Sequence, residues 1–291
     1  MKDLTTAPVA LFWYWISERH AIYLRRAEKQ PKPWTTDTIL RDYKFTNAFR
    51  ELDRGTIWLR RKFLEPHRDD DLSLVAFNIC WYRMFNWTGT GELLRWQTGW
   101  DAPAIKAELH AALDRGAQVF TGAHIVYSPP GMPKIDAIVD VCSDLYHLCV
   151  AGNALVTCAR EERRLETVYN GLREVHCVGG FMAYEMVSDM RHTRLLEDAT
   201  DIRTWANPGP GAKRGLQRLG LPYKKDADAI TSMRSLLALT DDGYHYTLAP
   251  HVPRPLEMRD IEHSLCEFDK YCRVKFGEGE PRSKYNGGAV A

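Results

Sequence analysis

The chain has 291 residues, of which 45% are hydrophobic and 26% are charged, a composition that excludes a disordered or fibrous protein. Lys and Arg number 39 against 38 Asp and Glu, so the bulk charge of +1 does not indicate a nucleic-acid partner. No apolar run approaches the roughly 20 residues that span a bilayer, and the N-terminus lacks the features of a signal peptide, so we expect a cytosolic protein without membrane contact.

Two helices are predicted at the N-terminus. Residues 9–26 contain no Gly or Pro and precede the helix-breaking sequence Gln-Pro-Lys-Pro at residues 30–33, a pattern typical of one amphipathic helix. Thr36 or Asp37 can cap a second helix, whose apolar positions continue to Leu52.

Two further helices and one strand are predicted before residue 130. Asp69–Asp71 precede residues 72–82, which are apolar on most faces and therefore indicate a buried helix. Asp101, followed closely by a proline, begins the next helix, which Gly116 ends. Residues 118–128 are the best strand candidate, although a short apolar run is also compatible with a buried loop, and a Pro- and Gly-rich turn or linker follows them.

The second half of the chain continues the helical pattern. It predicts helices at residues 135–150, 153–173, 181–194 and 227–239, and a helical stretch that includes residues 260–270. Because strand signals are so scarce, we expect a mostly α fold. The chain is predicted to form one helical unit, or two helical lobes at about residues 1–130 and 131–291.

The cysteines indicate neither a disulfide framework nor a zinc site. There are seven of them, irregularly spaced and never in a Cys-x-x-Cys pair, so they are predicted to be reduced thiols. His263 and Glu267 form an i,i+4 pair near the C-terminus, but the surrounding sequence is not HExxH and offers no evident third ligand. No metal is therefore expected.

Basic residues gather in two segments of this neutral chain. Residues 1–68 hold 14 basic and 8 acidic side chains, and residues 203–225 hold six basic and no acidic ones. Two such segments suit a single anionic groove, although a solvated face has the same pattern. The glycine-rich residues 207–215 allow backbone N–H groups and Lys213 to approach a phosphate, but they do not match GxxxxGK[ST], so a tight connection remains open as well.

A glycine turn separates two helical stretches in the second half of the chain. Residues 172–183, with Gly179-Gly180 at their centre, have the form of a helix-hairpin-helix, whose turn presents backbone amides to a DNA phosphate. A packed helix–helix turn is the alternative. The sequence from Arg214 to Leu221 resembles the R-V-x-x-R-L-G-L run that follows the catalytic Asp of helix-hairpin-helix DNA glycosylases. Gly209 then occupies the place of that Asp, which argues against cleavage of the glycosidic bond.

Candidate acids, bases and anion-binding side chains lie near both ends of the chain. A helix from residue 37 would place Asn47, Arg50 and Arg54 along one face, with Asp53 beside it. Exposed helix salt bridges are the alternative for all of these groups. Tyr23 and Trp34 could stack on a base or belong to the core. The N-terminal candidates are Glu18, Arg19, Asp37, Asn47, Arg50, Asp53 and Arg54.

These segments together resemble the helical, glycosylase-like proteins of bacteriophage thymine hypermodification. That family includes the helical domain of 5-hydroxymethyluracil DNA kinases and the amino acid:DNA transferases known as α-glutamyl/putrescinyl-thymine pyrophosphorylases. The resemblance covers nearly the whole chain. The segments that carry it are Trp15–His20, Pro33–Asp37, Phe45–Asn47, Arg50–Arg54, Asn207–Arg214 and Leu256–Tyr271 with Pro281-Arg282.

The resemblance implies a helix-hairpin-helix glycosylase-like fold with a DNA groove, in the cytoplasm of an infected bacterial host. The kinase branch carries a P-loop domain, and nothing in this sequence could be one, so the chain looks like the transferase branch. The implied reaction replaces the phosphate of 5-phosphomethyl-deoxyuridine in duplex DNA with the amine of an amino acid, first of all glycine, or of a polyamine. An active glycosylase and a non-catalytic DNA-binding module are the alternatives.

This chemistry makes several demands on the site. A base must take a proton from the amine, cations must receive the departing phosphate, and the modified base must leave the helical stack. No cofactor is expected, because the activating phosphate is already on the DNA. The implied bases are Glu18, Asp37, Asp53, His263 and Glu267; the implied anion-binding residues are Arg19, Asn47, Arg50 and Arg54; and the implied DNA contacts are Gly179, Gly180, Lys213 and Arg214.

Overall fold

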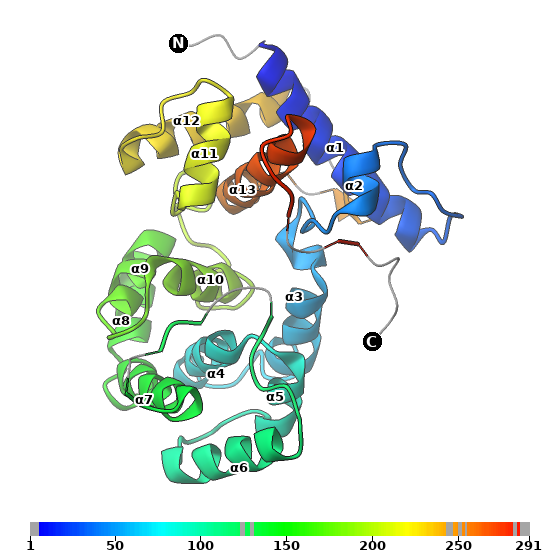
Figure 1. Cartoon of the computed structure of the whole chain (residues 1–291). Helices are drawn as coiled ribbons and strands as arrows, with labels where there is room; N and C mark the ends of the chain where they lie inside the picture. The colour runs from blue at the N-terminus through cyan, green and yellow to red at the C-terminus, as the bar shows by residue number, and fades with distance from the viewer. Residues whose placement is uncertain are drawn as a thin grey trace. The chain divides into compact units, whose positions relative to one another are not determined.

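The computed structural model describes residues 6–122, 126–128, 131–242, 247–249, 252–253, 255–281 and 284–285. These residues are mostly helical, which confirms the predicted fold class, and their two strands form one short antiparallel hairpin of β1 (Thr247–Ala249) and β2 (Val252–Pro253) (Figure 1). The chain divides into two compact units. Unit 1 comprises residues 1–53 and 203–291, and unit 2 comprises residues 54–202.

This division differs from the predicted boundary near residue 130. Unit 2 holds helices from both sides of that position, since α7 (Lys134–Tyr146) packs against both α4 (Leu72–Phe85) and α6 (Ala102–Asp114). Unit 1 is assembled from the two ends of the chain. The boundary follows long-range packing, which the local sequence pattern does not report.

Helix α13 (Met258–Lys275) is the centre of unit 1 and packs against four other helices. Phe268 on α13 meets Phe12 edge to face, with ring centroids 5.4 Å apart. Gly215 allows α11 to approach the backbone of α13 closely, because a Cβ atom there would lie 2.4 Å from the Leu265 carbonyl oxygen. The packed helices are α1 (Ala7–Ala27), α2 (Thr38–Asp42), α11 (Pro210–Arg218) and α12 (Asp226–Asp242); a 3-10 turn, η1 (Arg50–Leu52), completes the unit.

Helix α4 is the core of unit 2, and thirteen of its fourteen residues are buried, as its apolar sequence predicts. One charge is buried with it: the Arg83 guanidinium pairs with the Asp189 and Glu185 carboxylates of α10 (Gly180–Met190). The other elements are α3 (Arg54–Leu59), the π-helical turn η2 (Arg60–Leu64), α5 (Thr88–Leu94), the π-helical turn η3 (His147–Ala151), α8 (Ala154–Glu162) and α9 (Leu165–Arg173).

Local helix signals are confirmed where they do not depend on distant contacts. The carboxylates of Asp37, Asp71 and Asp101 each cap a helix by accepting N–H groups of its first turn. Gly116 follows α6 with a φ of +80°, a backbone conformation that favours glycine.

Three predicted elements are wrong. The helix from residue 37 ends at Asp42 rather than Leu52, because residues 43–49 make contacts with α13 instead. The helix over 153–173 is broken at Arg163, where φ is +50°, and a new helix, α9, follows. Residues 118–122 and 126–128 form no strand, and the rest of that segment lies outside the described residues.

The glycine-rich residues 207–215 are not a loop throughout, because α11 begins at Pro210. The seven cysteines are free thiols. Among the described helices, none alone is long and apolar enough to span a bilayer. Residues 134–151 and 154–162, which meet at a bend of 56°, satisfy that test as a pair by length and composition only.

Candidate functional site

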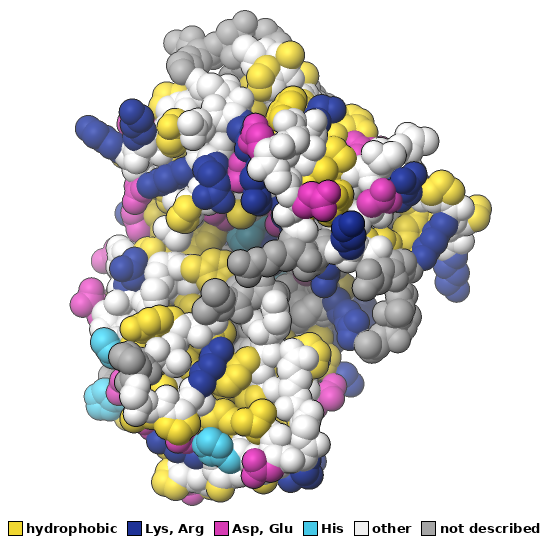
Figure 2. All heavy atoms as spheres, in the orientation of Figure 1, with side chains coloured by type: hydrophobic (Ala, Val, Ile, Leu, Met, Phe, Trp, Pro, Cys, Tyr) yellow, Lys and Arg dark blue, Asp and Glu magenta, His cyan; other side chains and the backbone are white. Residues whose placement is uncertain are grey.

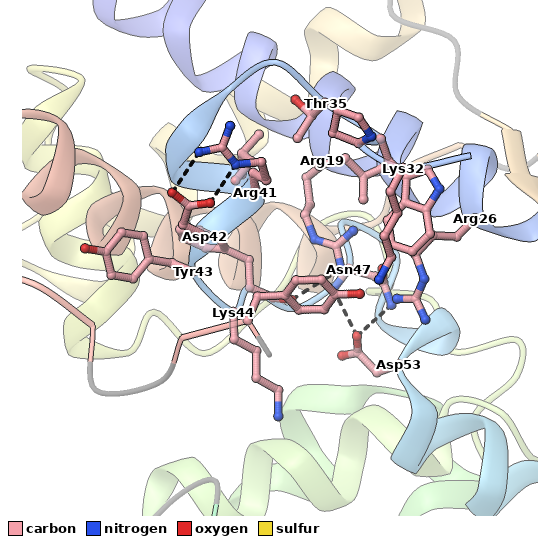
Figure 3. Close-up of a pocket in the computed structure, with 16 residues that line it drawn as sticks. Arg19, Arg26, Lys32, Thr35, Arg41, Asp42, Tyr43, Lys44, Asn47 and Asp53 are labelled. Atoms are coloured by element: carbon pink, nitrogen blue, oxygen red, sulfur yellow. Dashed lines mark hydrogen bonds and ion pairs between the residues drawn. The ribbon is translucent and has the colours of Figure 1, made fainter. Parts of the chain in front are cut away.

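A cavity of about 420 Å³ lies within unit 1, between the C-terminal half of α1, the segment that follows it and residues 40–53 (Figure 3). Its volume falls in the range of roughly 300 to 1,000 Å³ that is typical of small-molecule sites. Basic side chains outnumber acidic ones in its lining, which favours an anionic ligand. The basic residues are Arg19, Arg26, Lys32, Arg41 and Lys44, and the acidic residues are Asp42 and Asp53.

Arg19 is the most buried cation in this lining, with 9% of its surface exposed. It projects from α1, and its Nη2 donates to the Phe45 carbonyl at 3.3 Å. Its Nη1 is also buried and has no hydrogen-bond partner among the described residues. Burial lowers the pKa of the guanidinium below its ordinary value, and the Asp53 carboxylate opposes that shift. Arg19 therefore retains donor capacity for an anion in the cavity.

Tyr285 supplies a second buried donor that has no hydrogen-bond partner among the described residues. Its backbone N–H donates to the Asp42 carbonyl at 2.9 Å, which fixes Tyr285 against the cavity wall. Its phenolic oxygen is buried and has no partner within the described part of the chain. Buried polar atoms normally have partners, so two such donors in one cavity indicate a ligand site.

Asp53 is the one predicted base that lines the cavity. Its Oδ1 accepts the backbone N–H and the side-chain amide of Asn47, and its Oδ2 pairs with Arg50 Nε at 2.9 Å. The same Asn47 amide donates to the Leu52 carbonyl at 2.9 Å. These bonds form in an irregular segment rather than along the predicted helix face, and Figure 3 shows Arg19, Asn47 and Asp53 around one space.

Trp34 forms part of the cavity wall. Arg26 and Lys32 lie over its ring, 5.4 and 5.0 Å from the centroid. Glu18 does not line the cavity but supports Trp34 indirectly. It pairs with Arg25 at 2.9 Å, and Arg25 in turn donates to the Trp34 carbonyl. Tyr23, the other predicted stacking residue, does not line the cavity and instead stacks on His20.

Asp37 does not line the cavity, and both of its carboxylate oxygens have partners. Oδ1 caps α2, and Oδ2 accepts the phenols of Tyr14 at 3.1 Å and Tyr271 at 2.8 Å. Burial and this carboxylate raise the pKa of Tyr14 to about 12 and raise that of Tyr271 as well. Asp37 thus joins α1, α2 and α13.

The two predicted bases on α13 also lie outside the cavity lining. Glu267 accepts the Thr46 backbone N–H at 3.0 Å and pairs with Lys270 at 2.7 Å. Lys270 donates to the Lys44 carbonyl at 3.0 Å, so this pair holds the segment that carries the cavity wall. His263 Nδ1 lies 2.7 Å from the Arg259 carbonyl, one turn earlier on the same helix.

The predicted DNA contacts fall in both units. Lys213 pairs with Asp226 at 2.6 Å, and Arg214 with Asp269 at 2.8 Å, so these cations have carboxylate partners. Gly179 precedes α10 in unit 2, where the turn between α9 and α10 borders an open hollow. Arg54, predicted to bind the phosphate or the amino acid rather than DNA, begins α3 in unit 2 and does not line the cavity.

Sequence patterns did not single out several residues of the cavity. Arg26, Lys32, Arg41 and Tyr285 lie in it without matching a spacing rule, although Lys32 directly precedes the Pro33–Asp37 motif. Within the described residues, no group of three or more His, Cys, Asp or Glu side chains could hold a metal ion.

Comparison with known proteins places these observations in a family. The protein-family model described as "5-hmdU DNA kinase, helical domain" matches residues 6–280 of the chain. A curated relative, the 5-hmdU DNA kinase of Bacillus phage SP10, is 25% identical over 93% of this chain and 46% of its own length. The chain thus spans about half the length of that relative. No solved structure matches it.

Proposed function

Since the chain belongs to the family of the 5-hmdU DNA kinase helical domain, as its motifs predict, we propose that it is a phage enzyme that modifies thymine-type bases in DNA. Specifically, it is an amino acid:DNA transferase. Its substrates are duplex DNA that carries 5-phosphomethyl-deoxyuridine and a small amino acid, with glycine as the first choice. It acts in the cytoplasm of the infected host.

The reaction exchanges one bond for another at the exocyclic methylene of the base. The amine nitrogen forms a bond to this carbon, and the carbon–oxygen bond to the phosphate breaks. Inorganic phosphate leaves with the bonding electron pair, and the ammonium form of the amino acid gives its protons to the site or to solvent. The enzyme must therefore bind anions and accept a proton.

The observation that carries this proposal is the buried Arg19 guanidinium, whose Nη1 has no partner among the described residues. A charge in such a place costs stability unless it is paired, and a guanidinium fork matches the oxygens of a carboxylate or a phosphate. Arg19 thus suits the amino-acid carboxylate or the departing phosphate. The Tyr285 phenol is a second donor to the same anion.

Asp53 is the proposed base, because it alone among the candidate bases lines the cavity. Its three bonds to Asn47 and Arg50 hold the carboxylate in place. An ammonium group beside it would be attracted and deprotonated there. Glu18, Asp37 and Glu267 are then positioning residues, which hold the Trp34 wall, helix α2 and the segment at Thr46.

The modified base must leave the duplex to reach this chemistry. Trp34 lies in the cavity wall, and an extruded pyrimidine can stack on its ring when Arg26 or Lys32, which lie over that ring, gives up this contact. Base flipping is therefore part of the proposal, and the Gly179-Gly180 turn of unit 2 is proposed to hold a DNA phosphate through its backbone amides.

Mass spectrometry of nucleosides tests the function directly. Phosphomethylated duplex DNA is incubated with the protein and isotope-labelled amino acids, digested and analysed. We expect a nucleoside that contains the labelled amino acid, with release of one inorganic phosphate per product. Unchanged DNA with every amino acid and polyamine supplied would refute the transferase.

One observation favours a glycosylase as a second candidate. Gly209, which aligns with the glycosylase Asp, lies beside the carboxylate of Glu262, whose Oε1 accepts its N–H at 3.3 Å. A carboxylate from α13 thus lies near the position at which the glycosylases carry their catalytic Asp. Alkali-labile abasic sites that appear with the active protein and disappear in Glu262→Gln would favour this candidate, whereas the transferase leaves the glycosidic bond intact.

A further inference from the structure

We propose that Arg26, Lys29 and Lys32 form a basic rim at the exposed edge of the cavity, and that this rim binds the DNA backbone beside the base that the cavity receives. The choice of DNA as the partner rests on the proposed function. The rim belongs to unit 1 and differs from the predicted DNA contacts at Lys213 and Arg214.

The rim is a local excess of positive charge. Residues 25–32 hold four cations and one carboxylate, that of Glu28, which accepts a hydrogen bond from Gln30 at 2.7 Å. Arg25 pairs with Glu18, but Arg26 and Lys29 form no ion pair with any described residue. Figure 2 shows Lys and Arg side chains, in dark blue, near the place where α1 ends in Figure 1. The exposed charges of Arg26 and Lys29 are therefore available to a phosphate backbone.

Helix stability accounts for only part of this pattern. Cations in the last turn of α1, such as Arg26, favourably oppose the helix dipole. Lys29, with a φ of +58°, is the left-handed residue of the turn that ends α1, in which the Lys29 and Gln30 N–H groups donate to the Arg26 and Arg25 carbonyls. This turn explains the backbone conformation of Lys29 but does not require a cation there, and Lys32 lies beyond it.

The aromatic ring of Trp34, which two of the cations contact, favours nucleic acid over an acidic peptide. Arg26 and Lys32 lie over Trp34, and all three residues also line the cavity. Surfaces that bind nucleic acid combine cations for the backbone with aromatic faces for the bases. The rim and the cavity are therefore continuous, so one nucleotide could place its phosphate on the rim and its base in the cavity.

Three of the six cations in the alternative basic segment, residues 203–225, have carboxylate partners within the fold. Lys213 has Asp226 as a partner, and Arg214 shares Asp269 with Arg218. Burial acts to raise the pKa of Asp269, but the hydrogen bonds from both arginines outweigh it and lower the pKa, so the carboxylate stays ionised. Fewer counterions would be released when DNA contacts this segment.

The test compares two matched pairs of exposed lysines in unit 1. Lys29→Gln with Lys32→Gln removes two charges from the rim, and Lys224→Gln with Lys225→Gln removes two from the segment 203–225. Binding to unmodified fluorescent duplex DNA is measured by anisotropy over a series of salt concentrations, after circular dichroism shows that both variants fold. The rim pair should lower affinity and make the log–log salt slope shallower by roughly two, while the control pair changes it by less than one.

Two outcomes would overturn the proposal that the rim binds DNA. Equal slopes for both variants and the wild type would remove these lysines from the DNA interface. Equal loss of binding to polyglutamate and to DNA would show a general anion surface rather than a nucleic-acid site. Because the DNA carries no phosphomethyl group, the measurement is independent of transfer, so failure of the transferase proposal and failure of the rim are distinguishable.

Discussion

The carboxylate of Asp53 accepts both N–H groups of Asn47 through a single oxygen, the backbone N–H at 2.9 Å and the side-chain amide at 3.0 Å. The two residues are six positions apart in an irregular segment, and both line the cavity. The Asp53 carboxylate thereby holds Asn47, its neighbour in the cavity lining, in place. A role in catalysis and a role in local structure must be separated by experiment.

Asp53→Asn should lower single-turnover transfer by at least about 10²-fold, since loss of a general base typically costs 10² to 10⁴. An amide there also gives up the ion pair with Arg50, so the free energy of unfolding should fall by about 1 to 3 kcal/mol. Asn47→Ala is the control, because it loosens the same wall and keeps the carboxylate. If both variants lose transfer equally, Asp53 acts only through structure.

Arg19→Met should abolish binding of the anion without destabilising the fold. The guanidinium is buried, and its Nη1 has no hydrogen-bond partner among the described residues. Replacement of such a buried charge by an apolar side chain is often neutral or stabilising. We expect transfer to fall by about 10² to 10³, with an unchanged or higher urea midpoint. Arg41→Met, which removes a cavity cation already paired with Asp42, should stay within about tenfold of wild type.

Glu18→Gln should impair transfer through the Trp34 wall rather than by removal of a base. Loss of its ion pair frees Arg25, which holds the Trp34 carbonyl. Transfer should fall at least about tenfold, because misplacement of a binding wall weakens the alignment of the substrate. The thermal midpoint should remain near wild type. Glu28→Gln, on the exposed side of the same region, is the matched control, and an equal loss there would contradict the assignment.

Stability should fall between about pH 10 and pH 12 through Tyr14. Its pKa is raised to about 12 in the folded state by burial and by Asp37, against an ordinary value of 10. The protonated phenol therefore favours folding, and this contribution is complete below pH 10 and lost as the pH rises through 12. Solvent screening reduces its size, because Tyr14 is 43% exposed.

Urea midpoints across this pH range check the effect. Tyr14→Phe should lose less stability than the wild type between pH 10 and pH 12. Tyr127→Phe, an exposed tyrosine of unit 2, should follow the wild-type curve. Parallel curves of urea midpoint against pH for all three proteins would show that the Tyr14–Asp37 contact does not cause the loss of stability.

Gly215→Ala should destabilise the packing of α11 on α13 by about 2 to 4 kcal/mol. The new Cβ would lie 2.4 Å from the Leu265 carbonyl oxygen, which belongs to the backbone and cannot move as a side chain does. Gly55→Ala in α3 is the opposite case, since no atom beyond the neighbouring helix backbone lies within 4 Å of that Cβ. It should stabilise the helix by about 0.5 to 1 kcal/mol. Chemical denaturation of both variants measures the difference.

The sequence by itself determined the features that depend on neighbouring residues. Asp71 and Asp101 cap their helices as predicted, since a cap needs only the first turn beside it. The apolar residues 72–82 are buried as predicted, because a helix apolar on most faces has no solvated orientation. The ordered motifs, read together, identified the family.

Only the tertiary structure decided which candidates share a site. Residues 43–49 leave the predicted helix because α13, more than 200 positions later, offers Glu267 and Lys270 as partners for their backbone groups. That departure brings Asp53 to the cavity beside Arg19, while Asp37 is held outside it by Tyr14 and Tyr271. Likewise, Arg214 in a segment without acids finds Asp269 on another helix. Spacing along the chain does not report such partners, because hydrogen bonds and ion pairs depend on distance in space.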